Sequence, residues 1–109
     1  MPDISFDMDA MHFIWDEDKN NRNIQKHGIS FETAAFVFKD NLRLEQMDQA
    51  HSTMDEIRYV TIGMVHDILT VVYCERGNEP NMIIRLISAR HATKVEKDLY
   101  NNTMYGRYY

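Results

Sequence analysis

The spacing of apolar residues predicts helices in the first part of the chain and strands in the second. One helix begins at Ser30, whose hydroxyl can accept a hydrogen bond from the first turn. The apolar residues that follow have the i, i+3, i+4, i+7 spacing of a buried helix face; they are Phe31, Ala34, Ala35 and Phe38. Asp40 and Asn41 are typical turn residues, so we expect this helix to end before them.

An earlier helix is predicted over residues 17–27. Asp16 can cap its N-terminus, and Gly28 can end it because glycine readily adopts the left-handed conformation that often follows a helix. Acidic residues occupy its first turn, and Lys26 and His27 occupy its last, which matches the helix dipole.

From residue 42 onward the apolar period changes to two, which is typical of strands. The predicted strands are Leu42–Met47, Glu56–Val65, Ile68–Glu75 and Met82–Ser88, with a further short strand, His12–Trp15, before the first helix. A short turn at residues 66–67 and a longer loop at 76–81 connect hairpins. The polar segment 48–55 is expected to be a mobile loop.

These elements predict a single α+β domain over residues 1–109. It consists of one short strand and two helices, followed by a four-stranded antiparallel meander and a C-terminal helix. We expect that helix to run from about residue 91 to 101, with Ala92, Val95 and Leu99 facing the sheet. Residues 1–11 are interpreted as a loose acidic leader, and residues from about 102 to 109 as a flexible tail.

The composition narrows the class of protein. A length of 109 residues with 44% hydrophobic and 27% charged residues is typical of one soluble globular domain. Cys74 is the only cysteine, so neither a disulfide framework nor a CxxC motif is present. No apolar run is long enough to cross a membrane, and the first eleven residues lack the cations of a secretory signal. We therefore expect a cytoplasmic protein.

The net charge of −5 is unevenly distributed. The first twenty residues contain six acidic side chains and one lysine, whereas residues 81–109 contain five basic and two acidic side chains. Binding to a phosphate backbone depends on the local patch more than on the total charge. The basic C-terminal part is therefore compatible with nucleic acid, although mixed charge is also ordinary for a soluble surface.

The segment 82–91 carries the strongest chemical signal. Strand alternation places Arg85 on one face with two isoleucines, where a desolvated guanidinium needs an anion. Arg90 follows at the end of the strand, and Lys94 follows in the predicted helix. This concentration of positive charge indicates a phosphate site. The alternative is that Arg85 is structural and bonds a buried carboxylate or carbonyls of the protein itself.

Lys26 and His27 form a second candidate site at the end of the first helix. In that helix only Ile24 is clearly apolar, so hydrophobic burial does not explain how the helix docks. One interpretation is that Asn23 and His27, which share a helix face, hydrogen-bond neighbouring backbone. The other places Lys26 and His27 at the mouth of a groove beside the sheet.

Other catalytic and cofactor motifs are missing from the sequence. The five histidines are scattered without ligand spacing, so we predict no metal site and no cofactor. The sequence has no G-x-S-x-G, Walker or G-x-G-x-x-G motif. Cys74 lies in a strand pattern and is interpreted as a small core residue.

Three blocks of residues, in order between about Phe13 and Tyr100, are similar to a known family. The first contains Trp15-Asp16, Lys19, Asn23, residues 26–32, Ala35 and Phe38. The second contains residues 55–59 with Ile62-Gly63, and the third contains Val71-Val72-Tyr73, Glu75-Arg76-Gly77, residues 84–90, Ala92-Thr93, Glu96 and Tyr100. Together they resemble the BrnT toxins, the ribonucleases of the BrnT/BrnA type II toxin–antitoxin systems.

The resemblance implies a RelE-like fold and metal-independent RNA cleavage, which would inhibit translation. It also implies neutralisation by a BrnA-like antitoxin that carries a ribbon-helix-helix DNA-binding domain. Toxin and antitoxin of this family assemble as a two-plus-two complex that represses its own operon. Contact with DNA is therefore expected only through the antitoxin, and no membrane partner is expected.

Metal-independent cleavage uses the RNA 2′-hydroxyl as nucleophile and needs a base, an acid and cations. Arg85 and Arg90 are expected to stabilise charge on the phosphate, because a guanidinium fork matches two phosphate oxygens. His27 is the candidate acid or base, since imidazole titrates near neutrality. Lys26 is a candidate for phosphate binding or proton transfer.

Further residues are candidates for RNA binding, namely Arg58, Ser88 and Lys94. For Arg58, cross-strand ion pairing remains an equal alternative. Glu56 and Glu75 are possible bases or surface partners of arginines.

The competing hypothesis is a catalytically weak interaction module. Its main role would be to form the DNA-binding, autoregulating complex with the antitoxin. The basic candidate residues favour the enzyme, whereas the net charge and the acidic leader favour the module.

Overall fold

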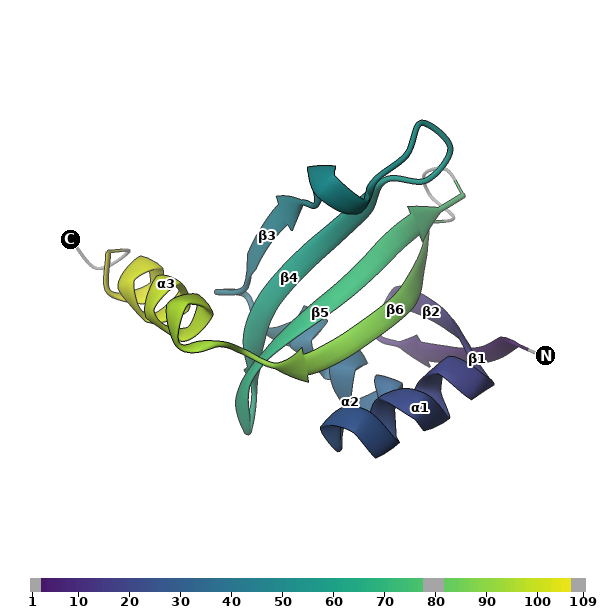
Figure 1. The fold of residues 1–109 in the computed structure, drawn as a ribbon, viewed down its shortest axis with the longest axis horizontal. Helices are drawn as coiled ribbons and strands as arrows, with labels where there is room; N and C mark the ends of the chain where they lie inside the picture. The colour runs from purple at the N-terminus through teal and green to yellow at the C-terminus, as the bar shows by residue number, and fades with distance from the viewer. Residues whose placement is uncertain (1–2, 78–81, 107–109) are drawn as a thin grey trace.

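The computed structural model describes residues 3–77 and 82–106 (Figure 1). The elements follow in the order β1 (Asp3–Met8), β2 (Met11–Asp16), α1 (Glu17–His27), α2 (Phe31–Ala35), the 3₁₀ helix η1 (Phe36–Lys39), β3 (Leu44–Met47), the 3₁₀ helix η2 (Gln49–His51), β4 (Arg58–Val65), β5 (Asp67–Arg76), β6 (Ile83–His91) and α3 (Lys94–Gly106). Residues 78–81 of the predicted hairpin loop and 107–109 of the predicted tail lie outside the described residues.

The predicted α+β class is confirmed, but the predicted arrangement of strands is not. All six strands form one mixed sheet in the order β1-β2-β6-β5-β4-β3. β2 lies parallel to β6, and the other neighbours are antiparallel. The N-terminal part thus joins the sheet through two strands instead of the one short strand predicted. The parallel pairing joins residues about 70 positions apart, which local sequence patterns do not reveal.

The interpretation of residues 1–11 as a loose leader is wrong for the part that the structure describes. Asp3–Met8 forms β1, which pairs along its whole length with β2. Apolar Ile4, Phe6 and Met8 alternate with polar neighbours, so the period-two signal was present in the sequence. Asp9 at φ 55° makes the tight turn that joins the two strands.

The first helix begins and ends where the sequence predicts. The Asp16 carboxylate accepts from the backbone N–H groups of Asp18 and Lys19, and Gly28 adopts the left-handed conformation with φ 72°. Its docking is polar: the buried Asn23 amide donates to the carbonyl of Ala89 at 2.8 Å and accepts from its N–H at 3.1 Å. Asn23 therefore supplies hydrogen-bond partners for the backbone of Ala89, in the part of β6 that extends beyond its pairing with β2. This confirms the prediction that Asn23 hydrogen-bonds backbone groups.

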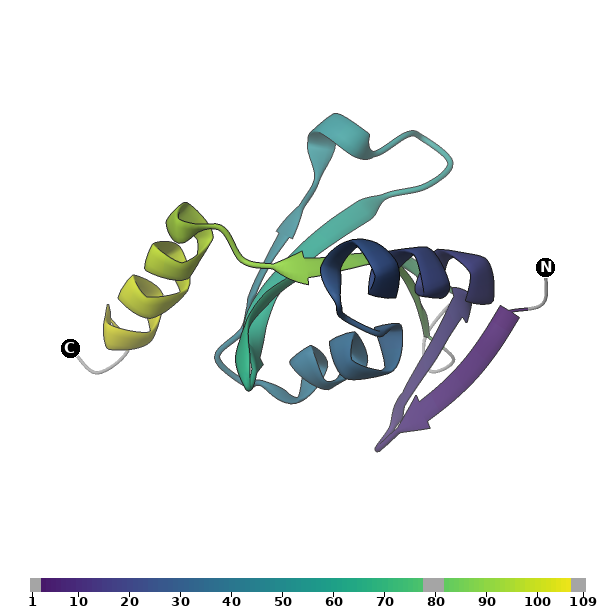
Figure 2. The same cartoon turned by 60° about the horizontal axis from the view of Figure 1, so that its bottom comes forward.

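One face of the sheet is covered by α1, α2 and η1 (Figure 2). The predicted spacing of the second helix is confirmed, because its four apolar residues are buried in the main core. The strands contribute their alternate residues to this core, among them Phe13, Val71, Tyr73, Leu86 and Ala89. We call the opposite side of the sheet the open face.

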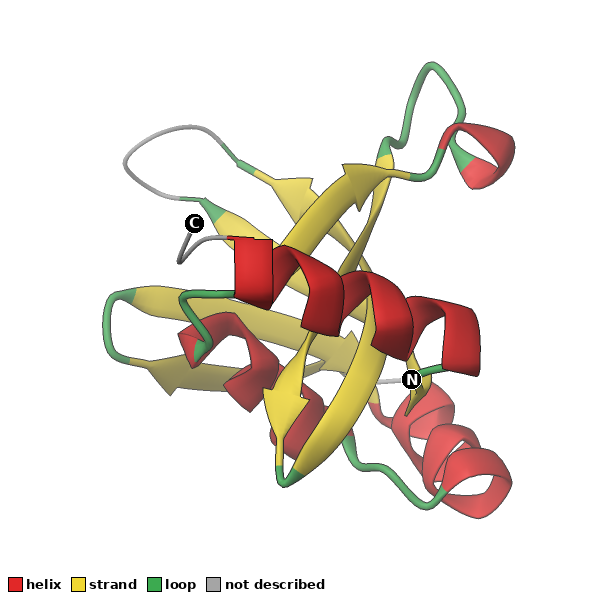
Figure 3. Ribbon diagram, turned by 90° about the vertical axis from the view of Figure 1, so that its left-hand side faces the viewer, coloured by secondary structure: helices red, strands yellow, loops and turns green. Residues whose placement is uncertain are grey.

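α3 lies at one end of the molecule, away from α1 and α2 (Figure 3). It begins at Lys94, later than predicted, because Thr93 and Glu96 form a reciprocal capping box. It continues to Gly106, so part of the predicted flexible tail is helical. The helix can extend this far because residues 102–105 include no glycine or proline to end it.

The predicted inward face of α3 is also wrong. The exception is Ala92, just before the helix, which is buried with Ile62, Ile68 and Tyr100 as predicted. Val95 is 76% exposed, and Leu99 is 51% exposed and only lines a groove opposite the strands. Within the described residues, no helix is both long and apolar enough to cross a membrane.

Candidate functional site

The open face carries most of the predicted basic site residues. Residues opposite one another in neighbouring strands share a face, so the pairing places three rows across β4, β5 and β6. These rows are Arg58–Cys74–Arg85, Val60–Val72–Ser88 and Ile62–Thr70–Arg90. The rows bring Arg58, Arg85, Ser88 and Arg90 onto one surface.

A bulge in β6 makes this arrangement possible. Tyr73 pairs with Leu86 and Val72 pairs with Ser88, so Ile87 is an extra residue without a partner in β5. Under strict alternation, Arg85 and Arg90 would point to opposite faces of the sheet. The bulge shifts the alternation by one residue and turns Arg90 to the open face beside Arg85.

Arg85 is paired with the first strand. Its Nη1 and Nη2 donate to the two carboxylate oxygens of Asp3 at 3.0 and 3.1 Å. The hydrogen bonds from Arg85 lower the pKa of the Asp3 carboxyl and raise that of the guanidinium. Arg85 thus bonds a carboxylate of the protein itself, as the structural alternative predicts, but this carboxylate is partly exposed and not buried.

Arg90 makes a similar fork with Glu96 of α3. Nη1 lies 2.6 Å from Oε1 and Nη2 lies 3.0 Å from Oε2. The carboxylate also accepts from the hydroxyl of Thr70 and the backbone N–H of Thr93. These donors, with Arg90 the strongest, lower the pKa of Glu96 to about 2. Glu96 is therefore an anion at neutral pH and orients Arg90.

Arg58 and Arg76 share the carboxylate of Glu56. The distances are 3.2 Å from Arg58 Nε to Oε1 and 3.3 Å from Arg76 Nη2 to Oε2. Arg58 therefore forms an ion pair, but with Glu56 of its own segment and not across strands; the interpretation of Glu56 as a surface partner of arginines is confirmed. The pair is partly exposed, so it leaves N–H donors of both guanidinium groups available to a ligand.

A pocket of about 340 Å³ lies among these side chains, and we call it the arginine pocket. It is lined by Asp48, His51, Arg58, Val60, Val72, Ile87, Ser88, Arg90 and Glu96. Three predicted site residues, Arg58, Ser88 and Arg90, thus line one cavity. Arg85 is on the same face but does not line this pocket.

The remaining predicted site residues lie elsewhere. Lys26 and His27 end α1, on the covered side of the sheet, and their side chains make no hydrogen bond or ion pair within the described part of the chain. Lys94, at the start of α3, is 86% exposed and pairs with Asp98 at 2.9 Å. The geometry does not bring Lys26, His27 or Lys94 into contact with the paired arginines.

Two residues of the arginine pocket were missed by the sequence analysis. His51 and Asp48 lie in the segment that was expected to be a mobile loop, whereas residues 49–51 form η2. Their i, i+3 spacing was the available signal, because a short helical turn brings such residues together. In residues 3–77 and 82–106, no group of three or more His, Cys, Asp or Glu residues could hold a metal ion.

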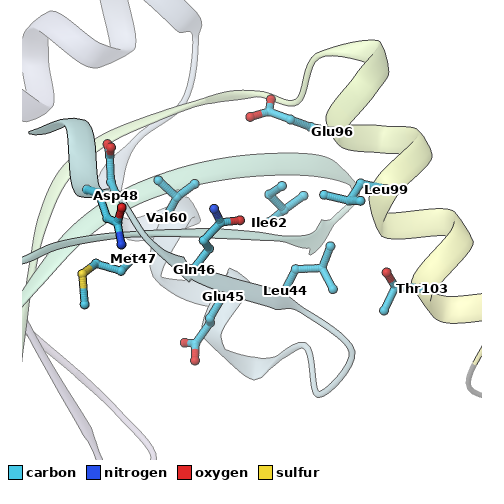
Figure 4. Close-up of a pocket in the computed structure, with 11 residues that line it drawn as sticks. Leu44, Glu45, Gln46, Met47, Asp48, Val60, Ile62, Glu96, Leu99 and Thr103 are labelled. Atoms are coloured by element: carbon cyan, nitrogen blue, oxygen red, sulfur yellow. The ribbon is translucent and has the colours of Figure 1, made fainter.

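A second, larger pocket of about 790 Å³ adjoins the first and shares Asp48, Val60 and Glu96 with it. Figure 4 shows its walls: Leu44, Gln46, Val60 and Ile62 on the strands face Leu99 and Thr103 on α3, while Glu45 points away. The lining of this groove mixes apolar residues such as Leu44, Ile62 and Leu99 with polar ones, so the open face combines a cationic pocket with a groove of mixed polarity.

The arrangement suits an anionic, extended ligand. The partly exposed guanidinium groups of Arg58, Arg85 and Arg90 share one face of the sheet, and Ser88 adds a hydroxyl between them. No curated protein matches the chain. A family model described as "Ribonuclease toxin, BrnT, of type II toxin-antitoxin system" matches residues 15–96. This match spans the three strands that line the arginine pocket, β4, β5 and β6, and the chain belongs to the BrnT family of ribonuclease toxins of type II toxin–antitoxin systems.

Proposed function

We propose that this toxin cleaves RNA as a metal-independent endoribonuclease, and that the scissile phosphate binds in the arginine pocket. The observation that carries this proposal is the convergence of Arg58, Ser88 and Arg90 on one cavity of the open face. Guanidinium groups recognise phosphate by paired hydrogen bonds and keep their charge at all relevant pH values.

In the proposed reaction the RNA 2′-hydroxyl attacks the adjacent phosphorus. The bond from phosphorus to the 5′-oxygen breaks, and the products carry a 2′,3′-cyclic phosphate and a 5′-hydroxyl. Arg58 and Arg90 stabilise the charge that builds up on the phosphoryl oxygens. Glu96 holds the Arg90 guanidinium in place before substrate binds, which reduces the reorganisation needed during the reaction.

Arg85 lies on β6 in the same row as Arg58 and extends the cationic surface just outside the pocket, where a neighbouring phosphate of the same RNA strand can bind. Lys94 is proposed to contact RNA from α3, which its 86% exposed side chain allows. Lys26 and His27 remain candidates for proton transfer. For that role the RNA would have to reach the end of α1 as well as the open face.

The family implies an antitoxin partner. We propose that this partner is a BrnA-like, ribbon-helix-helix protein in a two-plus-two complex, and that the complex contacts DNA only through the antitoxin. The proposed setting is the cytoplasm, where free toxin would cut cellular RNA and inhibit translation.

The test is cleavage of a defined RNA by the purified chain in the presence of EDTA. We expect cleavage with 2′,3′-cyclic phosphate ends, identified by mass spectrometry. Arg90→Ala should lower the cleavage rate roughly 10²–10³-fold, as loss of one preorganised donor typically does. Arg22→Ala, an exposed arginine on α1, is the matched control. Wild-type cleavage that depends on a divalent ion, or full activity of a folded Arg90→Ala chain, would contradict the proposal.

The alternative is a catalytically weak module that acts within the antitoxin complex. It is favoured by the ion pairs of Arg58, Arg76, Arg85 and Arg90, each of which already faces a carboxylate of the same chain. If this alternative holds, expression of the toxin alone will leave bacterial growth unimpaired, although the folded protein accumulates. The enzyme instead predicts growth arrest that the cognate antitoxin relieves.

A further inference from the structure

One titratable side chain of the arginine pocket has no role in the reaction described so far. His51 ends η2, the short 3₁₀ helix between β3 and β4, and lines the pocket with Arg58, Ser88 and Arg90. Its side chain is 71% exposed, so a bound RNA strand can reach the ring.

The position of His51 is fixed by Asp48. His51 Nδ1 lies 2.9 Å from Asp48 Oδ2, and the Asp48 side chain is only 19% exposed. The Asp48 backbone N–H donates to the carbonyl of Arg58 at 2.8 Å, and its carbonyl accepts from Ser52 Oγ at 2.6 Å. Ser52 Oγ also accepts from the N–H of Arg58 at 2.9 Å. These bonds tie the turn to the start of β4, beside the pocket.

This contact also determines which ring nitrogen can accept a proton. A carboxylate only accepts hydrogen bonds, so Nδ1 of His51 carries the hydrogen that Asp48 receives. In the neutral ring the lone pair is then on Nε2, which makes no hydrogen bond to the residues that the structure describes. The pair has the geometry in which a carboxylate orients an imidazole base.

We propose that His51 is the general base of the RNA cleavage reaction and that Asp48 is its positioning residue. This inference rests on the proposed function. Neutral His51 takes the proton of the 2′-hydroxyl at Nε2 while the new bond from oxygen to phosphorus forms. The 5′-oxygen leaves and takes a proton from water, and His51 returns its proton to the hydroxide so produced.

The charges around His51 suit this cycle. Asp48 stabilises the imidazolium that forms during attack, while Arg58 from β4 and Arg90 from β6 oppose it. Glu96 from α3 offsets the charge of Arg90. The same two arginines stabilise the phosphorane, so proton removal and phosphate stabilisation occur in one cavity.

The experiment compares His51→Gln with wild type in cleavage and in binding. Glutamine keeps a similar polar shape but cannot take up a proton, so we expect a fall in kcat of roughly 10²–10⁴-fold. Binding of a 2′-deoxy analogue, which is not cleaved, should stay within about twofold, because a base acts mainly in the transition state. In wild type, kcat/KM should rise with pH where imidazole loses its proton, and this rise should disappear in His51→Gln.

Asp48→Asn tests the positioning role. The amide can donate to Nδ1 and so favours the tautomer that leaves no lone pair on Nε2. We therefore expect kcat to fall about tenfold or more, and the rise of kcat/KM with pH (the acid limb of the profile) to be displaced. Asp48→Glu should restore part of the rate. The matched control is His66→Asn in the β4–β5 turn, at φ 59°, a conformation that asparagine tolerates. It should retain full activity.

The outcomes separate the two proposals. A folded His51→Gln chain that cleaves RNA within about threefold of wild type, with an unchanged acid limb, overturns the role of His51 and leaves the proposed function standing. Loss of analogue binding in His51→Gln also overturns it, since His51 would then be a binding residue. A wild-type chain that cleaves no RNA overturns both proposals.

Discussion

Replacement of Glu96 by glutamine should weaken the link between the sheet and α3 in a pH-dependent way. Glu96→Gln keeps an oxygen that can accept from Thr93 and Thr70 but removes the charge-assisted fork with Arg90. Hydrogen bonds to charged groups contribute roughly 1.5–3 kcal/mol when buried. The side chains of Glu96 and Arg90 are 20% and 39% exposed, so solvent screening reduces the expected loss to about 1–2 kcal/mol.

At pH 7 the variant should melt roughly 4–16 °C below wild type, because a loss of about 1 kcal/mol lowers the melting temperature of a domain of this size by roughly 4–8 °C. The folded-state pKa of Glu96 is about 2, below its ordinary value of 4.5. Because the folded pKa is the lower one, the stabilisation is fully present above about pH 4.5 and is lost as pH falls toward 2. The difference between the two proteins should therefore narrow over that interval.

The assay is urea denaturation of both proteins at pH 7, 5, 4 and 3. Asp98→Asn provides the matched control on the same helix, because the Lys94–Asp98 pair is well exposed and should contribute about 0–0.5 kcal/mol. A difference between wild type and Glu96→Gln that is as large at pH 3 as at pH 7 would refute the reasoning. So would a loss no greater than that of Asp98→Asn at pH 7.

Two further substitutions test the packing that supports the site. Asn23→Ala removes both hydrogen bonds to the Ala89 backbone and leaves buried polar groups without partners. The free energy of unfolding should therefore fall by roughly 3–5 kcal/mol. The control Asn21→Ala, at an exposed position of the same helix, should change it little. Gly63→Ala would place a Cβ 2.7 Å from Val37 Cγ1, and overpacking should cost about 1–3 kcal/mol. Both values come from urea midpoints, and a wild-type midpoint in either variant would contradict the packing described.

Local signals predicted the local elements well. Asp16 and Gly28 define the ends of α1 because capping is a property of a few adjacent residues. The alternation of β1 was also readable but was missed, since Asp3, Asp7 and Asp9 were interpreted only as charge. A strand with one polar face at a sheet edge has this appearance.

The arrangement of the site depends on contacts that local patterns do not encode. The carboxylate partner of Arg85 lies 82 positions earlier, on β1. Simple alternation would separate Arg85 from Arg90, and only the bulge at Ile87 places both on the open face. His51 was missed because isolated histidines were weighed as metal ligands, whereas its neighbours in space come from β4 and β6.

The location of the RNA site can be tested most directly by NMR titration of the ¹⁵N-labelled toxin with a short 2′-O-methyl RNA, which cannot be cleaved by 2′-hydroxyl attack. The account predicts that the largest shift changes fall on the open face, at Arg58, Ser88, Arg90 and the side chains around them. Shift changes confined to the end of α1, around Lys26 and His27, with the open face unaffected, would contradict the assignment of the arginine pocket as the RNA site.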